Sequence, residues 1–234
     1  WSRLVGSEMC IRDRYKPISS HIYKKNRDKF MSEMKKDSIA VFNSNDIYPI
    51  GADSTFPFEQ HRDIFYLTGI DQEETILILY PASKNYKTRE ILFIRKSDNY
   101  TKVWEGEKLS KKQANELSGI NNICYVEDFK DVLSSIATEV DTFYINKNEH
   151  YRANSPVETR EDRFISWLLK KYPDHNVAKS NPILQRQRSI KHPYEIDQIK
   201  RACEITGKGF NRVLKFIKPN ICLLYTSPSP RDET

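Results

Sequence analysis

Residues 57–79 read PFEQHRDIFYLTGIDQEETILIL, a polar loop followed by two apolar runs. The runs at 63–69 and 75–80 are rich in β-branched or aromatic residues and are bounded by turn residues, which is typical of strands. We therefore expect two strands here, separated by a charged turn. A loop rich in Asn, Asp, Pro and Gly is expected before them, at 43–57.

The polar residues at the start of this stretch are the first candidates for a site. His61, Arg62 and Asp63 directly precede an apolar run, so they could form the rim of a cleft. The alternative is that they are polar anchors that pack the loop onto the sheet. Both interpretations stay open on these residues alone.

The rest of the chain alternates between strand-like and helix-like segments. Further strands are expected at 38–42, 90–95, 122–126 and 142–145, and helices at 21–36, 110–117, 128–138 and 155–171. The most periodic segment starts at Pro193, and Pro219 ends the pattern. An initial run of strands followed by alternating strands and helices predicts an α/β fold with a mixed β-sheet flanked by helices.

Composition narrows the class of protein. The 234 residues are 38% hydrophobic and 30% charged with a net charge of +6, which fits a globular protein and argues against disorder. Lys and Arg are interspersed with acids, so no nucleic-acid partner is expected. No apolar run is long enough to span a membrane, so no membrane partner is expected either. Cys124 and Cys203 have no CxxC neighbour and lie among apolar residues, so they are expected to be buried, unreactive thiols of a reducing compartment.

Residues that could carry hydrolytic chemistry are scattered. The histidines are His21, His61, His150, His175 and His192, with no HxxxH pairing and one HxxE, from His192 to Glu195, at the start of an expected helix. No G-x-S-x-G nucleophile motif and no paired Cys and His occur. We therefore expect neither catalytic residues nor metal ligands in this chain.

Both ends resemble translated sequencing adapter. Residues 4–13 and 222–232 match the two strands of one adapter when they are back-translated. We accordingly expect tails at 1–14 and 222–234 that take no part in the fold. The remaining chain is expected to divide into a first domain at 15–188 and the start of a second at 189–221.

Several motifs, taken in order and spacing, resemble the amino-terminal half of Xaa-Pro aminopeptidases (the aminopeptidase P family). They are residues 57–79 above, ILFIR at 91–95, VWEGEKL at 103–109, RSIKHPYEIDQIKRACEITGKGF at 188–210 and IKP at 217–219. The resemblance implies an amino-terminal domain of the creatinase/aminopeptidase P type. The helix from Pro193 would then be the first helix of an absent pita-bread catalytic domain.

The resemblance also implies an activity for the parent protein. It would be a cytoplasmic, homo-oligomeric metallopeptidase that releases the residue before proline from peptides with proline at the second position. In this family two Asp, one His and two Glu hold two divalent ions, usually manganese, which activate a water. Those ligands follow the IKP segment, so this chain should hold no cofactor and be inactive by itself.

Trp104 is the residue to which the resemblance gives a site role. The Trp of the family's W-x-G segment reaches the substrate pocket, its own or that of a neighbouring subunit, and a flat apolar ring suits a prolyl substrate. The alternative is packing beneath a loop. The chain departs from the family at Glu59, where a basic residue is usual, with His61 and Arg62 where Asn-Ser is common.

Two other functions stay open. The same architecture serves prolidases and creatinase-type hydrolases, although the FYLTG and WEG segments favour a peptidase. Creatinase-like domains also occur as metal-free binding modules.

Overall fold

The computed structural model describes residues 18–218, apart from residues 53, 98, 149, 151 and 153–155. The described residues divide into two compact units between Arg186 and Gln187. The expected assignment of 189–221 to a second domain stays a prediction. The expected tails at 1–14 and 222–234 lie outside the described residues.

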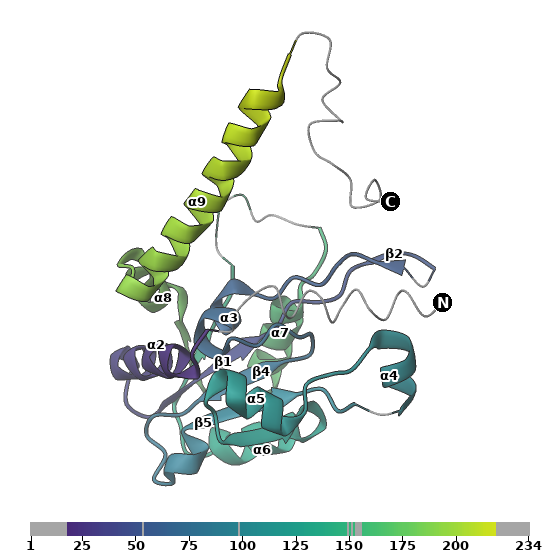
Figure 1. The fold of residues 1–234 in the computed structure, drawn as a ribbon. Coiled ribbons are helices and arrows are strands. Elements are labelled where there is room, and N and C mark those ends of the chain that lie inside the picture. The colour runs from purple at the N-terminus through teal and green to yellow at the C-terminus, as the bar shows by residue number, and fades with distance from the viewer. Residues whose placement is uncertain are drawn as a thin grey trace. The chain divides into compact units, whose positions relative to one another are not determined.

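The first unit is built on a six-stranded sheet in the order β6-β5-β4-β1-β7-β8 (Figure 1). The strands are β1 (Ser38–Asn43), β4 (Ile76–Leu79), β5 (Glu90–Ile94), β6 (Asn122–Tyr125), β7 (Thr142–Ile145) and β8 (Asn176–Lys179). Only β4 pairs antiparallel with its neighbours, and the β1–β7, β7–β8 and β5–β6 pairs are parallel. The carboxyl ends of the other five strands therefore lie at one edge of the sheet. The expected α/β fold with a mixed sheet is confirmed.

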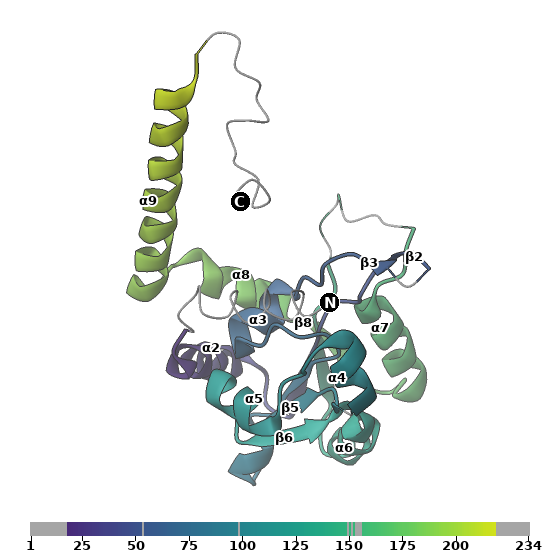
Figure 2. The same ribbon diagram turned by 45° about the vertical axis from the view of Figure 1, so that its right-hand side comes forward.

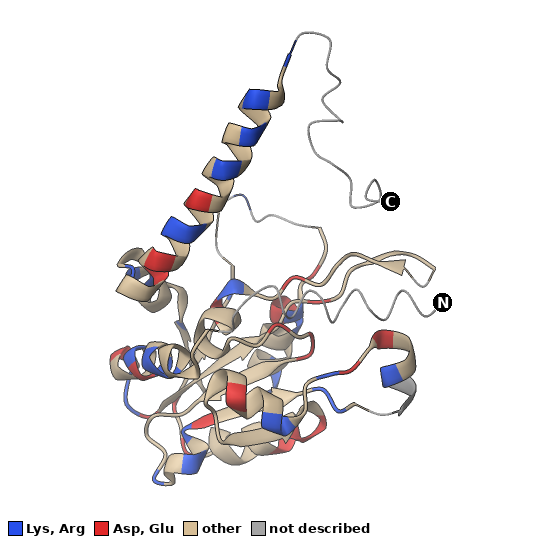
Figure 3. Ribbon diagram, viewed as in Figure 1, with Lys and Arg blue, Asp and Glu red and all other residues tan. Residues whose placement is uncertain are grey.

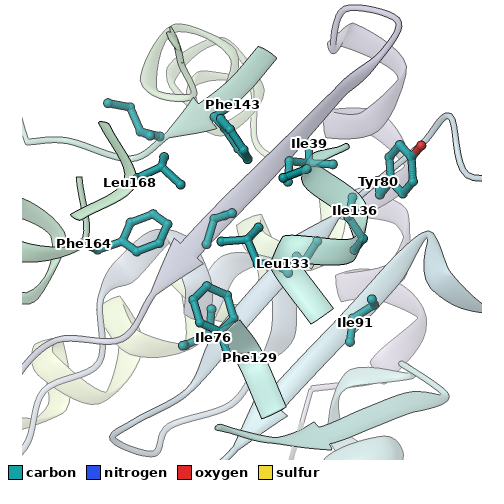
Figure 4. Close-up of a cluster of buried hydrophobic side chains, with 14 of the residues drawn as sticks. Ile39, Ile76, Tyr80, Ile91, Phe129, Leu133, Ile136, Phe143, Phe164 and Leu168 are labelled. Atoms are coloured by element: carbon teal, nitrogen blue, oxygen red, sulfur yellow. The ribbon is translucent and has the colours of Figure 1, made fainter. Parts of the chain in front are cut away.

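Alternate side chains of the strands face two separate cores, because the side chains of a strand point to opposite faces in turn. On one face the strands pack against α6 (Phe129–Ala137) and α7 (Arg160–Lys171). Figure 4 shows this core, in which Phe129, Leu133 and Ile136 lie against strand residues such as Ile39, Ile76 and Ile91. On the other face lie α2 (Ser20–Glu33), α3 (Arg62–Thr68), α5 (Lys111–Ser118) and the start of α8 (Asn181–Ser189). Figure 2 shows the two helical layers on either side of the sheet.

The expected strand at 63–69 is wrong, because these residues form α3. Ile64, Leu67 and Thr68 are buried, and their spacing of three and four places them on one face of a helix. The helix ends at Gly69, whose φ of +71° favours glycine. A Cβ at Gly69 would lie 2.3 Å from the ring of Tyr23, so a larger residue does not fit.

Other differences from the expected elements are smaller. The loop at 43–57 contains a short hairpin, β2 (Pro49–Gly51) and β3 (Ser54–Thr55). The sequence patterns also missed α4 (Asn99–Glu105), β8 and α8. The helix expected at 155–171 begins later, at Arg160, where Thr159 and Asp162 form a capping box. In the second unit, α9 (Pro193–Phe216) confirms the helix that was expected to start at Pro193.

Arg27 of α2 joins three of these elements. Its guanidinium donates to the carbonyl oxygens of Leu67 at 2.7 Å and Ser118 at 3.0 Å, and to Glu90 Oε2 at 3.1 Å. Leu67 and Ser118 lie in the last turns of α3 and α5, where carbonyl groups lack helical partners. Each helix then ends in a Leu-Thr/Ser-Gly-Ile segment, and the hydroxyl groups of Thr68 and Ser118 make equivalent hydrogen bonds. One fully buried cation thus binds the ends of two helices and one oxygen of a β5 carboxylate, whereas its own Nε and the Oε1 of Glu90 are buried without a hydrogen bond among the described residues.

Replacement of Arg27 by an uncharged residue should lower the stability of the fold. The variant Arg27→Met leaves two helix-end carbonyls and the Glu90 carboxylate without their donor, so we expect the free energy of unfolding to fall by about 3–5 kcal/mol. Urea unfolding followed by circular dichroism measures this loss. Arg186→Met is the control, because its pair with Glu33 at 2.7 Å is exposed and should contribute less than about 1 kcal/mol. Equal losses in the two variants would contradict the assigned role of Arg27.

Candidate functional site

The expected cleft residues lie near the carboxyl edge of the sheet. Here a polar cavity of about 290 Å³ opens beside the ends of β1 and β7 and the start of α7. Its lining includes Asn43, His61, Asn146, Arg160 and Glu161. Parallel strands present such a crevice at their carboxyl ends, which is the usual place for ligands in α/β sheets.

His61, Arg62 and Asp63 take different positions around this cavity. His61 lines it and caps α3, because its Nδ1 accepts a hydrogen bond from the Asp63 backbone nitrogen at 3.3 Å. The Asp63 carboxylate accepts from Asn146 Nδ2 at 3.1 Å, which joins α3 to the end of β7. Arg62 is exposed in the first turn of α3 and is not among the lining residues. The structure therefore places His61 in the wall and Asp63 behind it, bonded to the lining residue Asn146, and leaves Arg62 outside the cavity.

Glu161 and Arg160 are the charged groups of the cavity that the sequence patterns missed. The Glu161 carboxylate accepts from Asn43 Nδ2 at 2.7 Å and from the Asn146 backbone nitrogen at 3.1 Å. Burial raises the pKa of Glu161, and these two hydrogen bonds oppose that shift only in part. Arg160 donates to Ser44 Oγ at 3.2 Å, and burial lowers its pKa. A lone Glu at a helix start has no sequence signature that would single it out.

A second cavity of about 810 Å³ lies beside the segment that follows α4. Its wall includes Asp71, Gln72, Glu73 and the residues 105–109. Apolar side chains of Leu109 and Leu117 share the lining with these carboxylates. The volume is within the range of small-molecule and peptide pockets.

Trp104, the residue with an expected substrate role, lies on α4 immediately before this wall. Its side chain is 73% exposed, as is that of Val103 at 76%. Figure 1 shows α4 standing apart from the helices that cover the sheet. Such exposure does not fit the alternative in which Trp104 packs beneath a loop.

The described residues hold no group of three or more His, Cys, Asp or Glu side chains that could bind a metal ion. The pair of divalent ions implied by the family resemblance therefore finds no ligand set in this part of the chain. Within the same residues no helix is long and apolar enough to cross a membrane. Charged residues of both signs are interspersed over the ribbon (Figure 3).

Comparison with known proteins agrees with this architecture. The family model described as Aminopeptidase P, N-terminal domain matches residues 23–144. The Xaa-Pro aminopeptidase of Escherichia coli is 24% identical over 210 residues, which are 87% of this chain and 46% of that protein. Human Xaa-Pro aminopeptidase 3 is 24% identical over 227 residues, which are 92% of this chain and 42% of that protein. The chain thus spans less than half the length of these relatives.

Solved structures show the same fold. A Bacillus anthracis structure assigned as an aminopeptidase P superposes with a TM-score of 0.82 at 25% identity, covering 89% of this chain and 49% of that chain. The Glu-to-Ala variant of Escherichia coli aminopeptidase P in complex with substrate superposes with a TM-score of 0.75 at 22% identity, covering 90% and 48%. The likeness to the second structure concerns the fold alone.

The structure predicts a pH dependence for Glu161. Because its pKa is raised above the ordinary 4.5, the folded chain binds more protons than the unfolded chain as the pH rises from that value. Folding stability therefore falls across this window, and Glu161→Gln removes the titration. We expect the variant to gain stability relative to the parent as the pH rises above about 4.5, where the Glu161 carboxyl of the folded parent is still partly protonated.

Urea unfolding of both proteins at several pH values measures this difference. Any hydrogen bond lost by the Gln side chain offsets the two curves equally at all pH values, so only their divergence matters. Asp46→Asn, at an ion pair with Arg163 outside the Glu161 contacts, is the control. Parallel curves for Glu161→Gln and the parent would contradict the prediction.

Proposed function

Because this chain belongs to the family of aminopeptidase P N-terminal domains, we propose that it is the cleft-walling, oligomerising part of a metal-dependent Xaa-Pro aminopeptidase. The proposed reaction of the whole enzyme is release of the amino-terminal residue that precedes proline. The observation that carries the proposal is the exposed Trp104 on α4, in a chain whose family match covers residues 23–144.

Trp104 would supply binding rather than chemistry. An indole ring offers a large, rigid apolar face, and a prolyl ring is a compact apolar group that can lie against it. Such a contact made equally in the ground state and transition state lowers KM without changing kcat. The exposure of Trp104 suits a pocket that is completed by another surface, which we propose is a neighbouring subunit.

In this proposal, the two divalent metal ions bind to the catalytic domain of the whole enzyme. When bound there, two manganese ions would supply an activated water. The described residues offer no ligand set for these ions, so the chain alone should not cleave peptides. Its own residues would shape the cavity wall and hold Trp104 toward the substrate.

The expected cytoplasmic location is also part of the proposal. Cys124 and Cys203 are free thiols, which supports a reducing compartment, although the expected burial is wrong for Cys203, which is exposed on α9. Burial raises the pKa of Cys124, so this thiol should be unreactive.

A chimaera tests the proposal. Residues 18–218 are joined to the catalytic half of the Bacillus anthracis relative, and hydrolysis of an Xaa-Pro tripeptide is measured with manganese. We expect activity in the chimaera, none in the 234-residue chain alone, and a KM about tenfold higher in the Trp104→Ala chimaera with kcat unchanged, equivalent to about 1.4 kcal/mol of lost binding. Tyr86→Ala is the control, because Tyr86 is 67% exposed but lies outside the residues lining the second cavity.

Three results would contradict the proposal. They are cleavage by the chain alone, an unchanged KM in the Trp104→Ala chimaera, and a preference of the chimaera for dipeptides or creatine over the tripeptide. Mixing the Trp104→Ala chimaera with a chimaera inactivated in its catalytic half tests the subunit arrangement. If Trp104 acts on its neighbour, the mixed oligomers recover the low KM.

A further inference from the structure

Four charged side chains of alternating sign form a closed ring at the base of α4. We call Glu73, Arg95, Glu105 and Lys108 the charge ring. Arg95 contacts Glu105 at 2.5 and 3.0 Å and Glu73 at 3.3 Å. Lys108 contacts Glu73 at 2.6 Å and Glu105 at 3.6 Å. Each cation therefore lies between the same two anions, and Arg95 Nε also lies 3.9 Å from the more exposed Glu74 carboxylate.

The charge ring fastens the α4 segment to the body of the domain. Arg95 directly follows β5, whereas Glu105 is the last residue of α4 and Lys108 follows it, so the contacts hold the end of α4 against the end of β5. Glu73 lies just before β4 and its side chain is 8% exposed, which gives this segment a rigid anchor. Beside it, Gln72 Oε1 accepts from the Leu109 backbone nitrogen at 2.7 Å.

The charge ring is a network of partly exposed charges that can stabilise the position of the α4 segment. Isolated surface ion pairs contribute little, but a bidentate Arg–carboxylate pair within a network is the recognised exception. The hydrogen bond from Arg95 lowers the pKa of Glu105, so the carboxylate stays charged at neutral pH. Glu73, Glu105 and Lys108 also line the 810 Å³ cavity, so the same contacts fix its wall.

Trp104 is the residue adjacent to Glu105 on the same helical turn. We propose that the charge ring positions Trp104 and so orders the indole before substrate arrives, which makes Arg95, Glu105, Lys108 and Glu73 positioning residues. This inference rests on the proposed function for its link to a prolyl substrate. Its physical basis is that a loop ordered in advance loses less conformational entropy on binding.

Fluorine NMR of the chain labelled with 5-fluorotryptophan tests the positioning directly. Trp104→Phe identifies the Trp104 resonance, and the resonance of Trp167 in α7 reports on the core of the domain. In Glu105→Gln we expect the Trp104 resonance to move by more than its linewidth toward its position in the urea-unfolded chain. Hydrogen exchange of the amides at 99–105 should accelerate at least tenfold, while the Trp167 resonance stays in place.

The control variant is Glu33→Gln, which removes one charge from an exposed pair outside the ring. It should leave the Trp104 resonance unchanged. Arg95→Lys keeps the charge but loses the bidentate contact. Its Trp104 resonance should therefore lie closer to the parent position than the resonance of Arg95→Gln does. Unchanged Trp104 resonance and exchange in both Glu105→Gln and Arg95→Gln would overturn the inference.

A charge swap separates a ring from a simple pair. In the double variant Arg95→Glu with Glu105→Arg, an isolated pair would regain its contact and the Trp104 resonance would return to its parent position. In the charge ring the new Glu would face Glu73 and the new Arg would face Lys108, so we expect no rescue. Rescue by the swap would overturn the ring.

The failure of this inference can be told apart from failure of the proposed function. In the chimaera, Glu105→Gln should raise KM about as much as Trp104→Ala if both proposals hold. An unchanged KM in Trp104→Ala, together with a moved resonance in Glu105→Gln, would reject the substrate role of Trp104 and keep its positioning. A raised KM in Trp104→Ala with an unmoved resonance in Glu105→Gln would keep the substrate role of Trp104 and reject its positioning by the charge ring.

Discussion

The buried guanidinium of Arg27 is the contact on which the helical layer over one face of the sheet depends. Its side chain is fully buried, and it donates to the last turns of α3 and α5 and to Glu90 of β5. Burial of a cation costs less where hydrogen bonds replace its lost hydration, and three acceptors do so here for the two terminal nitrogens of the guanidinium. Asn26 of α2 adds a hydrogen bond to the Tyr66 carbonyl at 2.9 Å. The position of α2 therefore fixes the positions of α3 and α5.

Those helices in turn place the residues at the two cavities. The start of α3 carries His61 to the first cavity, and Asp63 beside it accepts a hydrogen bond from Asn146, a lining residue at the end of β7. The segment after Gly69 carries Asp71 to Glu73 to the second cavity. Glu73 anchors the charge ring, so the constraint that starts at Arg27 extends to the base of α4. The sheet thus supports two neighbouring polar regions, one closed by α7 and the other by the segment after α4.

The sequence could predict the helices and strands whose residue patterns are typical of only one of these two elements. The strands around Leu77 and Leu92 and the capped helix after Ser110 were expected and are present. The segment 63–69 was assigned the wrong element because Ile, Phe, Tyr and Thr favour strands, whereas burial of Ile64 and Leu67 on one helical face decided the outcome. The strand β8 was missed because its residues are largely exposed and lack an apolar pattern.

The candidate site was predictable only where motifs mark it. Trp104 could be singled out from the WEG segment; its side chain is exposed, and its substrate role stays a prediction. The charge ring could not be foreseen, because Glu73, Arg95 and Glu105 lie far apart in sequence and charged residues are common throughout the chain. Asn43 reaches Glu161 because β1 pairs in parallel with β7, the strand that precedes α7. Pairing between distant strands is the information that local patterns lack.

The central claim is that this domain contributes an ordered indole to a prolyl substrate site. A crystal structure of the chimaera with a bound Xaa-Pro peptide inhibitor tests it most directly. The account predicts that the Trp104 ring lies within about 4.5 Å of the prolyl ring, with the charge ring intact beneath it. A prolyl ring in contact only with the catalytic half, with Trp104 facing solvent, would contradict the account.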